Sequence, residues 1–441
     1  MILGLLVSLS ALASAPSGLG VPNHGGSIGT PTDTGVYGLT ATPTAAWSET
    51  PELLLDVAGL HSYYGVTLDG QELVAKEGAT AIPFMALTIP IGERFGVGLT
   101  LGAPYGRIGS GDENGPFRLW TIGGGIVLFE PRLNVAWKAS EKWTFGAGLR
   151  TGFSSFSMHT AMDTGTTLYQ LLGETAEDLI GDPLLEGDRI VEDGKGYGFG
   201  YSLGVRFEPV DRVAVVLSHH SSLGTPLNGT AIIQPSKDLD LVLQAQLFGQ
   251  WRYPMEIHAA ISVPAGPLDV RAHAEYIGWG TTTTTLATLN DPVVLSESAL
   301  LTEILHDYGL DDPAVLGTLE TSSESGMQNI LTGGLHISWR VNPQWMFLVG
   351  ASYAPGAIRD EWITPANIDM DGIDYRLAAQ WTLLQRLDFG LSLDIWSMKD
   401  RVITNSIGDP RNIDGLPTTP SANGAYELGI QRLGFSSRFR F

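Results

Sequence analysis

The sequence predicts an all-β protein, a transmembrane antiparallel β-barrel of about 14 strands with an N-terminal plug segment. Three observations support this. Apolar residues alternate with small or polar ones along almost the whole chain, and short connections alternate with long ones. Beyond the N-terminus no segment reaches the roughly 18 consecutive apolar residues that a membrane-spanning helix needs. A closed barrel is the other backbone that satisfies its own hydrogen bonds inside a bilayer.

The composition is typical of strands, tight turns and aromatic girdles. The 441 residues include 55 Gly, 11 Trp, 13 Tyr and 15 Phe, only 16% are charged, and Cys is absent. There are 25 basic residues against 47 acidic ones, which gives a formal net charge of -22. Because binding to a phosphate backbone requires clustered positive charge, we expect no nucleic-acid partner.

The chain divides into three expected regions. Residues 1–15 are predicted to be a signal peptide, because an apolar run ends in small-residue patterns of the kind that signal peptidase cleaves. Residues 16–50 are rich in Gly, Pro, Ser and Thr and lack alternation, so we expect a hatch folded inside the barrel. The alternative is a disordered periplasmic tail. Residues 51–441 are predicted to form the outer-membrane barrel with long extracellular loops.

The phase of the alternation predicts which side chains face the lumen. In residues 142–154, aromatic and aliphatic residues occupy one face, while glycines, Ser154 and Arg150 occupy the other. An arginine on the lipid face at mid-bilayer costs about 2–4 kcal/mol, so Arg150, Arg271 and Arg376 should point inward. By the same phase a luminal ladder is expected, consisting of Asp269, Arg271, His273 and Glu275.

Connection lengths predict the topology. Short turns are expected at 92–93, 139–141, 209–211, 264–266, 341–343 and 384–386. Long loops are expected at about 67–79, 105–117, 157–195, 222–253, 281–327, 357–371 and 401–424. Thirteen connections require about fourteen strands, with both barrel ends in the periplasm, and bacterial barrels have an even number of strands.

The last strand carries phenylalanines at alternate positions and closes on Phe441. This pattern resembles the signal by which the barrel-assembly machinery inserts outer-membrane proteins. We therefore expect a monomeric barrel in a bacterial outer membrane, in contact with the lipid bilayer and lipopolysaccharide.

Short motifs occur in residues 129–138, 143–149, 275–279 and 342–365. In their order and spacing they resemble the fourth, fifth, ninth and eleventh strands, with the loop after the eleventh, of the long-chain fatty acid transporters of the outer membrane (FadL type). This family includes importers of aromatic hydrocarbons, and the resemblance is good from about residue 129 onward. One departure is His220, which stands where the family often has an arginine.

The resemblance implies a substrate path that starts in an apolar groove between the third and fourth extracellular loops. The candidates for this groove are Leu168, Leu171, Leu172, Leu179, Leu243, Leu247 and Phe248. The alternative is that these side chains only pack the two loops together. The path then reaches a pocket in the barrel and leaves sideways beside a kinked third strand, for which Pro104 is the candidate because proline lacks the ladder donor.

The lumen and the hatch supply the remaining candidates. A carboxylate ligand needs a basic partner, and Arg150, Arg271 and His220 lie on the expected luminal face. The alternative is that these groups form ion pairs that brace the barrel. Thr42, Pro43 and Ala45 are the nearest match to the Asn-Pro-Ala motif of the family's hatch.

No enzyme activity, metal site or cofactor is predicted. The segment 200–204 matches G-x-S-x-G, but it lies within an expected strand, whereas the nucleophile motif requires a turn between a strand and a helix. His219 and His220 cannot bind one metal ion together, because adjacent strand residues point to opposite faces. Residues 369–372 resemble the start of a calcium loop without its later acidic ligand, which favours a simple turn.

These patterns predict passive, specific uptake of hydrophobic small molecules, with long-chain fatty acids first and aromatic hydrocarbons second. Two other functions stay open. A general water-filled porin would need an unplugged lumen and would lack apolar loop grooves, and a structural or adhesive barrel would bind surfaces through its loops.

Overall fold

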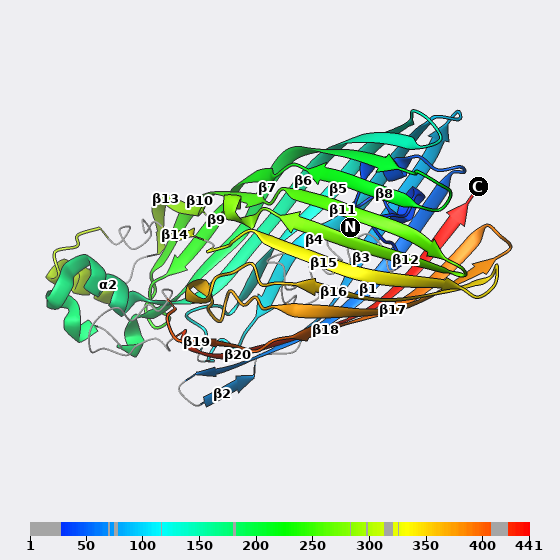
Figure 1. Cartoon of the computed structure of the whole chain (residues 1–441). Coiled ribbons are helices and arrows are strands. Elements are labelled where there is room, and N and C mark those ends of the chain that lie inside the picture. Colours follow the sequence, from blue (N-terminus) through cyan, green and yellow to red (C-terminus); the bar gives the residue numbers. More distant parts are fainter. Residues whose placement is uncertain are drawn as a thin grey trace.

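The computed structural model is a closed antiparallel barrel of 14 strands (Figure 1). It describes residues 28–68, 71–74, 78–115, 117–179, 182–282, 284–296, 299–312, 321–324, 326–406 and 422–441. The first and last strands pair with each other, from Glu52 opposite Arg440 to Thr67 opposite Ala425, and this pairing closes the barrel. The expected fold class is thereby confirmed, while the predicted signal peptide lies outside the described residues.

The barrel strands follow one another around the wall in chain order, and two of them are interrupted. They are β1 (Glu52–Leu68), β3 (Gly78–Ile91), β4 (Phe95–Ser110), β5 (Gly123–Lys138), β6 (Trp143–Asp163), β7 (Glu186–Phe207), β8 (Ala214–His220) continued by β9 (Leu223–Gln234), β10 (Val242–Tyr253) continued by β11 (Glu256–Ala265), β12 (Leu268–Ile277), β15 (Ile330–Arg340), β16 (Trp345–Ala354), β17 (Gly372–Leu383), β18 (Leu387–Met398) and β20 (Gly424–Arg440).

Shorter elements lie at the ends of the barrel and in its lumen. The remaining strands are β2 (Gln71–Val74), β13 (Thr284–Ser296), β14 (Thr321–Glu324) and β19 (Arg401–Ile403). The helices are η1 (Gly35–Tyr37), η2 (Pro43–Ala46), α2 (Thr164–Leu172), η3 (Gly173–Leu179), η4 (Pro183–Leu185), η5 (Trp279–Thr282), α3 (Ala299–Asp307) and η7 (Asp360–Trp362). Among the described residues, no helix is both long and apolar enough to cross a membrane.

All six predicted short turns join successive strands, and they confirm the expected hairpin pattern. Gly92 and Gly266 adopt positive φ angles of 66° and 64° in two of these turns, a conformation that glycine adopts without steric cost. The short turns and the C-terminus lie at one end of the barrel, and α2 lies at the other (Figure 1). The end with short turns is the periplasmic one, and the end with long loops is extracellular.

Several predicted loop boundaries were wrong, because the strands continue into the segments that had been expected to be loops. The segment 222–253, expected to be a loop, is largely the hairpin of β9 and β10, which pair from Leu223–Tyr253 to Ile233–Leu243. The predicted loop 105–117 likewise begins inside β4, and the loop 157–195 includes the ends of β6 and β7. In these segments the paired neighbouring strand keeps supplying backbone hydrogen-bond partners.

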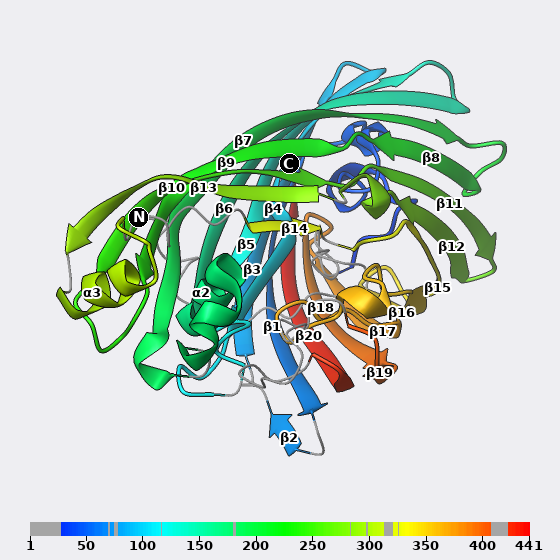
Figure 2. The same cartoon turned by 90° about the vertical axis from the view of Figure 1, so that its left-hand side faces the viewer.

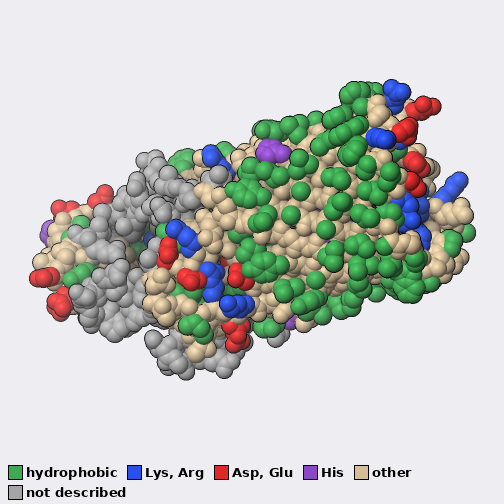
Figure 3. Space-filling model, viewed as in Figure 1, with side chains coloured by type: hydrophobic (Ala, Val, Ile, Leu, Met, Phe, Trp, Pro, Cys, Tyr) green, Lys and Arg blue, Asp and Glu red, His purple; other side chains and the backbone are tan. Residues whose placement is uncertain are grey.

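The outer wall is apolar, as the alternation predicted. On β5, Leu133, Val135 and Trp137 are exposed by 45–47%, while the intervening Arg132 and Asn134 are buried in the interior. Figure 3 shows hydrophobic side chains spread over the barrel wall, with charged side chains gathered toward its two ends. Stacked aromatic rings of Trp345, Trp381, Phe389 and Phe435, with successive centroids 5.9–6.3 Å apart, form part of a girdle. This surface is that of a barrel embedded in lipid.

Candidate functional site

Residues 28–50 lie inside the barrel near its periplasmic end, where Figures 1 and 2 show them surrounded by strands. Their buried side chains pack against the luminal faces of the strands. The cluster contains Ile28, Val36, Tyr37, Leu39, Ala45 and Ala46 of the segment and Leu54, Phe84, Ala86, Ala136, Leu348 and Ala378 of the wall. We call residues 28–50 the internal segment.

Wall glycines allow the internal segment to approach closely around the predicted hatch residues. Thr42 caps η2 by accepting a hydrogen bond from Thr44 N, and Pro43 opens the helix. A Cβ atom on Gly146 would lie 2.5 Å from Thr44 N, and one on Gly204 would lie 2.7 Å from Thr42 Oγ1. These two glycines therefore leave the space that η2 occupies.

Polar side chains of the wall also bind the backbone of the internal segment. Arg132 Nη1 donates to Thr40 O at 2.7 Å, and Arg206 Nη1 donates to Thr32 O at 2.7 Å. The hydroxyl of Ser218 donates to Ala41 O at 2.5 Å. Buried luminal arginines thus satisfy carbonyl groups that would otherwise lack partners.

The three predicted luminal cations all contact protein groups. Arg150 is fully buried and donates to both oxygens of Glu130, at 2.7 and 3.0 Å. The Arg271 guanidinium lies 3.2 Å from Asp33 Oδ1 in the internal segment. His220 Nδ1 lies 3.3 Å from Glu256 Oε2. Their proposed contact with a ligand carboxylate stays a prediction.

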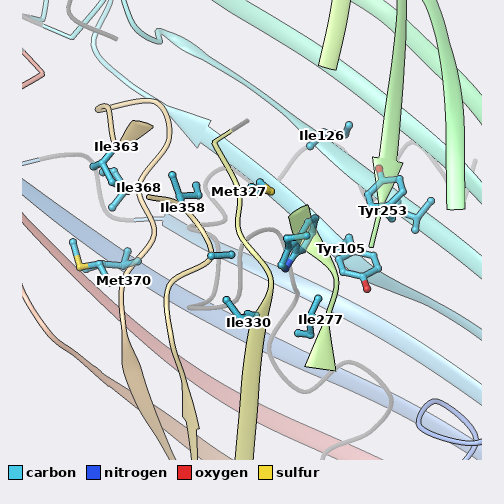
Figure 4. Close-up of a cluster of buried hydrophobic side chains, with 14 of the residues drawn as sticks. Tyr105, Ile126, Tyr253, Ile277, Met327, Ile330, Ile358, Ile363, Ile368 and Met370 are labelled. Atoms are coloured by element: carbon cyan, nitrogen blue, oxygen red, sulfur yellow. The ribbon is translucent and has the colours of Figure 1, made fainter. Parts of the chain in front are cut away.

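An apolar cluster lies in the lumen toward the extracellular end of the barrel (Figure 4). We call it the luminal apolar cluster. Its buried members are Val66, Tyr105, Ile126, Leu128, Leu223, Leu227, Tyr253, Ile277, Trp279, Met327, Ile330, Ala357, Ile358, Ile363, Ile368, Met370, Ile403, Tyr426 and Leu428. They come from β1, β4, β5, β9, β10, β12, β15, β19 and β20, from η5, from the segment just before β15, and from the loop between β16 and β17. The alternation predicted inward residues of this kind but could not show that they meet.

Three aromatic rings form one side of this cluster. The rings of Tyr105 and Tyr253 stack with centroids 5.2 Å apart, and Trp279 meets Tyr105 edge-on at 5.6 Å. The hydroxyl groups of Tyr253 and Ser154 share a hydrogen bond of 2.9 Å. The trio therefore presents flat apolar faces with a polar atom at the edge.

Arg107 is a luminal cation that the sequence interpretation missed. It follows Tyr105 by two residues on β4, and its Nη1 donates to Asn367 Oδ1 at 2.8 Å. Within the described part of the chain, no carboxylate oxygen lies within 4.0 Å of its guanidinium, in contrast to Arg150 and Arg271. The alternation Tyr105-Gly106-Arg107 was the available signal, but the segment had been interpreted as a loop.

Five of the seven candidate groove residues meet in a second apolar cluster, between the loops at the extracellular end. Leu168, Leu243 and Leu247 are buried there, and Leu172 and Leu179 pack against them. Leu301 and Leu305 of α3 join the same cluster, which sequence reasoning missed. Phe248 lies on the opposite face of β10 and is 41% exposed. The side chain of Leu171 lies outside the described part of the structure.

Pro104 marks an irregularity in β4 without ending the strand. The pairing of β4 with β5 shifts by one residue between Gly102 and Tyr105, which is the signature of a β-bulge. β4 then continues to Ser110. Pro104 therefore lies at the bulge of the third barrel strand, where a kink was expected.

A closed barrel with an apolar outer wall, short turns at one end and long loops at the other defines a β-barrel protein of the outer membrane. The sequence model of the outer membrane protein transport proteins (OMPP1/FadL/TodX) matches residues 56–249 of this chain. This finding confirms the FadL-type resemblance. No curated protein sequence matches the chain.

Solved structures of this kind share the fold along nearly the full chain. A FadL homologue from Pseudomonas aeruginosa is 16% identical, with a TM-score of 0.75, and the alignment covers 98% of this chain and 100% of that one. The toluene transporter TodX of Pseudomonas putida is 12% identical, with a TM-score of 0.66 and coverage of 91% and 93%. The toluene transporter TbuX of Ralstonia pickettii is 14% identical, with a TM-score of 0.64 and coverage of 98% and 99%.

Proposed function

We propose that the protein mediates passive uptake of hydrophobic molecules that carry a carboxylate, with long-chain fatty acids as the first candidates. The observation that carries this proposal is the position of Arg107 beside the luminal apolar cluster. An acyl chain would contact the cluster, and its carboxylate would accept hydrogen bonds from the guanidinium. Asn367, the present partner of Arg107, is neutral, so a carboxylate is the stronger acceptor.

A general porin is a weaker alternative on the same grounds. The internal segment lies across the periplasmic half of the lumen, and the luminal apolar cluster lies toward the extracellular end. Conduction of polar solutes requires a continuous column of water. In this proposal the internal segment and the luminal apolar cluster interrupt it. Liposome swelling with sugars tests this alternative directly, and we expect almost no swelling.

Aromatic hydrocarbons are the second candidate substrates. The rings of Tyr105, Tyr253 and Trp279 suit a small flat ligand, and two of the similar structures are described as toluene transporters. Such a ligand has no charge for Arg107 to bind. Replacing Arg107 therefore distinguishes the two substrate classes.

The proposed path begins at the loop cluster of Leu168 and Leu243, crosses the luminal apolar cluster, and leaves the barrel near the bulge at Pro104. The internal segment serves in this proposal as the hatch below the binding region. As further parts of the proposal, the monomeric barrel is inserted by the barrel-assembly machinery and is surrounded by lipid and lipopolysaccharide.

The test measures binding of oleate and of toluene to the refolded protein. A charge-assisted hydrogen bond contributes about 1.5–3 kcal/mol, so Arg107→Gln should weaken oleate binding about tenfold or more and leave toluene binding unchanged. The matched control is Arg118→Gln, which removes a guanidinium paired with Glu186 in the outer loops. Equal oleate affinity in Arg107→Gln and the unmodified protein would remove the basis for a carboxylate ligand.

A further inference from the structure

Two histidines and two glutamates gather on the luminal face of three neighbouring strands. Strand pairing places them there. Glu256 on β11 lies opposite His220 on β8, and His258 on β11 lies opposite Glu275 on β12. Glu256 and His258 are two residues apart and so share one face of their strand.

The distances among these side chains suit a single bound ion. His258 Nε2 and His220 Nδ1 lie 3.2 and 3.3 Å from the same Oε2 atom of Glu256. The ligand atoms of these three residues all lie within 4.8 Å of one another. In a tetrahedral zinc site with bonds of about 2.0–2.2 Å, ligand atoms lie about 3.3–3.6 Å apart. Small side-chain shifts therefore suffice to close the site.

We propose that His220, Glu256 and His258 bind a divalent transition-metal ion, with zinc as the natural choice and Glu275 as a fourth ligand. Glu275 Oε1 lies 3.7 Å from His258 Nε2. A donor set of two imidazole nitrogens and carboxylate oxygens binds zinc in preference to magnesium or calcium. The side chains of His220 and Glu256 are exposed by only 1% and 6%, so the wall already holds them in place.

Both positive and negative groups surround the proposed ion. Arg132 Nη1 lies 3.3 Å from His220 Nδ1 and opposes a positive ion. Arg132 is itself paired with Glu130, whose carboxylate it shares with Arg150. Glu256 and Glu275 together supply the two negative charges that balance the ion.

The site adjoins the internal segment, because Arg132 also donates a hydrogen bond to the carbonyl of Thr40.

Another pair of luminal histidines provides a contrast. The rings of His273 and His336 stack with centroids 5.2 Å apart, and in the described structure neither lies within 4.0 Å of a carboxylate oxygen. That pair lacks the oxygen ligands, so it serves as the control. The proposal does not depend on which substrate the barrel transports.

The experiment uses the full-length barrel refolded in detergent with and without zinc, so that access to the lumen does not limit binding. After exhaustive dialysis, metal analysis should find one zinc per chain refolded with the metal. Cobalt in place of zinc should give the visible absorption of a four-coordinate site. His258→Gln and Glu256→Gln should each weaken zinc binding more than about 100-fold, while the double variant His273→Gln/His336→Gln should bind as the unmodified protein does.

Heat-modifiable mobility on gels checks that each variant is a folded barrel. The proposal is overturned if the unmodified protein holds no stoichiometric zinc under either refolding condition. It is also overturned if the double variant His258→Gln/Glu256→Gln retains the metal with unchanged affinity. If only the His273→Gln/His336→Gln variant loses zinc, the assignment of the site to His220, Glu256 and His258 is overturned.

Discussion

Replacing Glu130 with glutamine should strongly destabilise the barrel. The carboxylate is 2% exposed and accepts hydrogen bonds from Arg132 Nε at 2.5 Å and from Arg150 Nε at 2.7 Å. Both arginines are buried as well. Glutamine keeps the size of the side chain but removes its negative charge, so two buried guanidinium groups lose their shared counterion.

The size of the effect follows from burial. Removing one partner of a buried ion pair costs about 3–5 kcal/mol, because the remaining charge stays in a medium of low dielectric constant. The matched control is Glu141→Gln. Glu141 pairs with Lys138 at 3.2 Å, but its side chain is 94% exposed, and such a surface pair contributes less than about 1 kcal/mol.

Equilibrium unfolding by urea in lipid vesicles, followed by tryptophan fluorescence, measures both variants. We expect a large loss of unfolding free energy for Glu130→Gln and almost none for Glu141→Gln. The triple variant in which Glu130, Arg132 and Arg150 become apolar should recover much of the loss. If Glu130→Gln costs no more than Glu141→Gln, the cluster is hydrated and the argument from burial fails.

Three further predictions concern register, the hatch and pH. A cysteine at Arg271 should react with water-soluble reagents and one at Val270 only with lipid-phase reagents; the reverse pattern would place the strand one residue out of register. Deleting residues 20–45 should leave a barrel that inserts but conducts ions well above the level of the intact protein, and unchanged conductance in planar bilayers would show that the segment does not block the lumen. Burial raises the pKa of Asp369 to about 6 from 3.8, although its Oδ2 accepts hydrogen bonds from the backbone N–H groups of Ala357 and Ile358. The protonated carboxyl therefore stabilises the β16–β17 loop below about pH 4, and this contribution, about 3 kcal/mol at most, is lost as the pH rises through 6. Hydrogen exchange in this loop, corrected for intrinsic rates, should be faster at pH 7.5 than at pH 5, and Asp369→Asn should remove that difference.

The sequence correctly predicted those features of the candidate site that depend on the alternation within a single strand. The phase of the alternation placed Arg150 and Arg271 in the lumen, because a strand turns successive side chains to opposite faces. It failed at Arg107, because turn-forming residues in the next segment led to a loop interpretation, whereas β4 continues to Ser110. It also did not bring together His220, Glu256 and His258, because only Glu256 and His258 of these three are close in the chain.

The sequence by itself determined the barrel, its short turns and the lipid-facing side of each strand. Those features depend on a period of two residues and on the cost of charge in hydrocarbon, and both are local properties. Only the tertiary structure decided which luminal groups meet. Strand register set His220 opposite Glu256, and the placement of residues 28–50 in the lumen gave Arg132 and Arg271 their partners. Contacts between strands depend on pairing offsets and on barrel closure, which the alternation within a single strand does not encode.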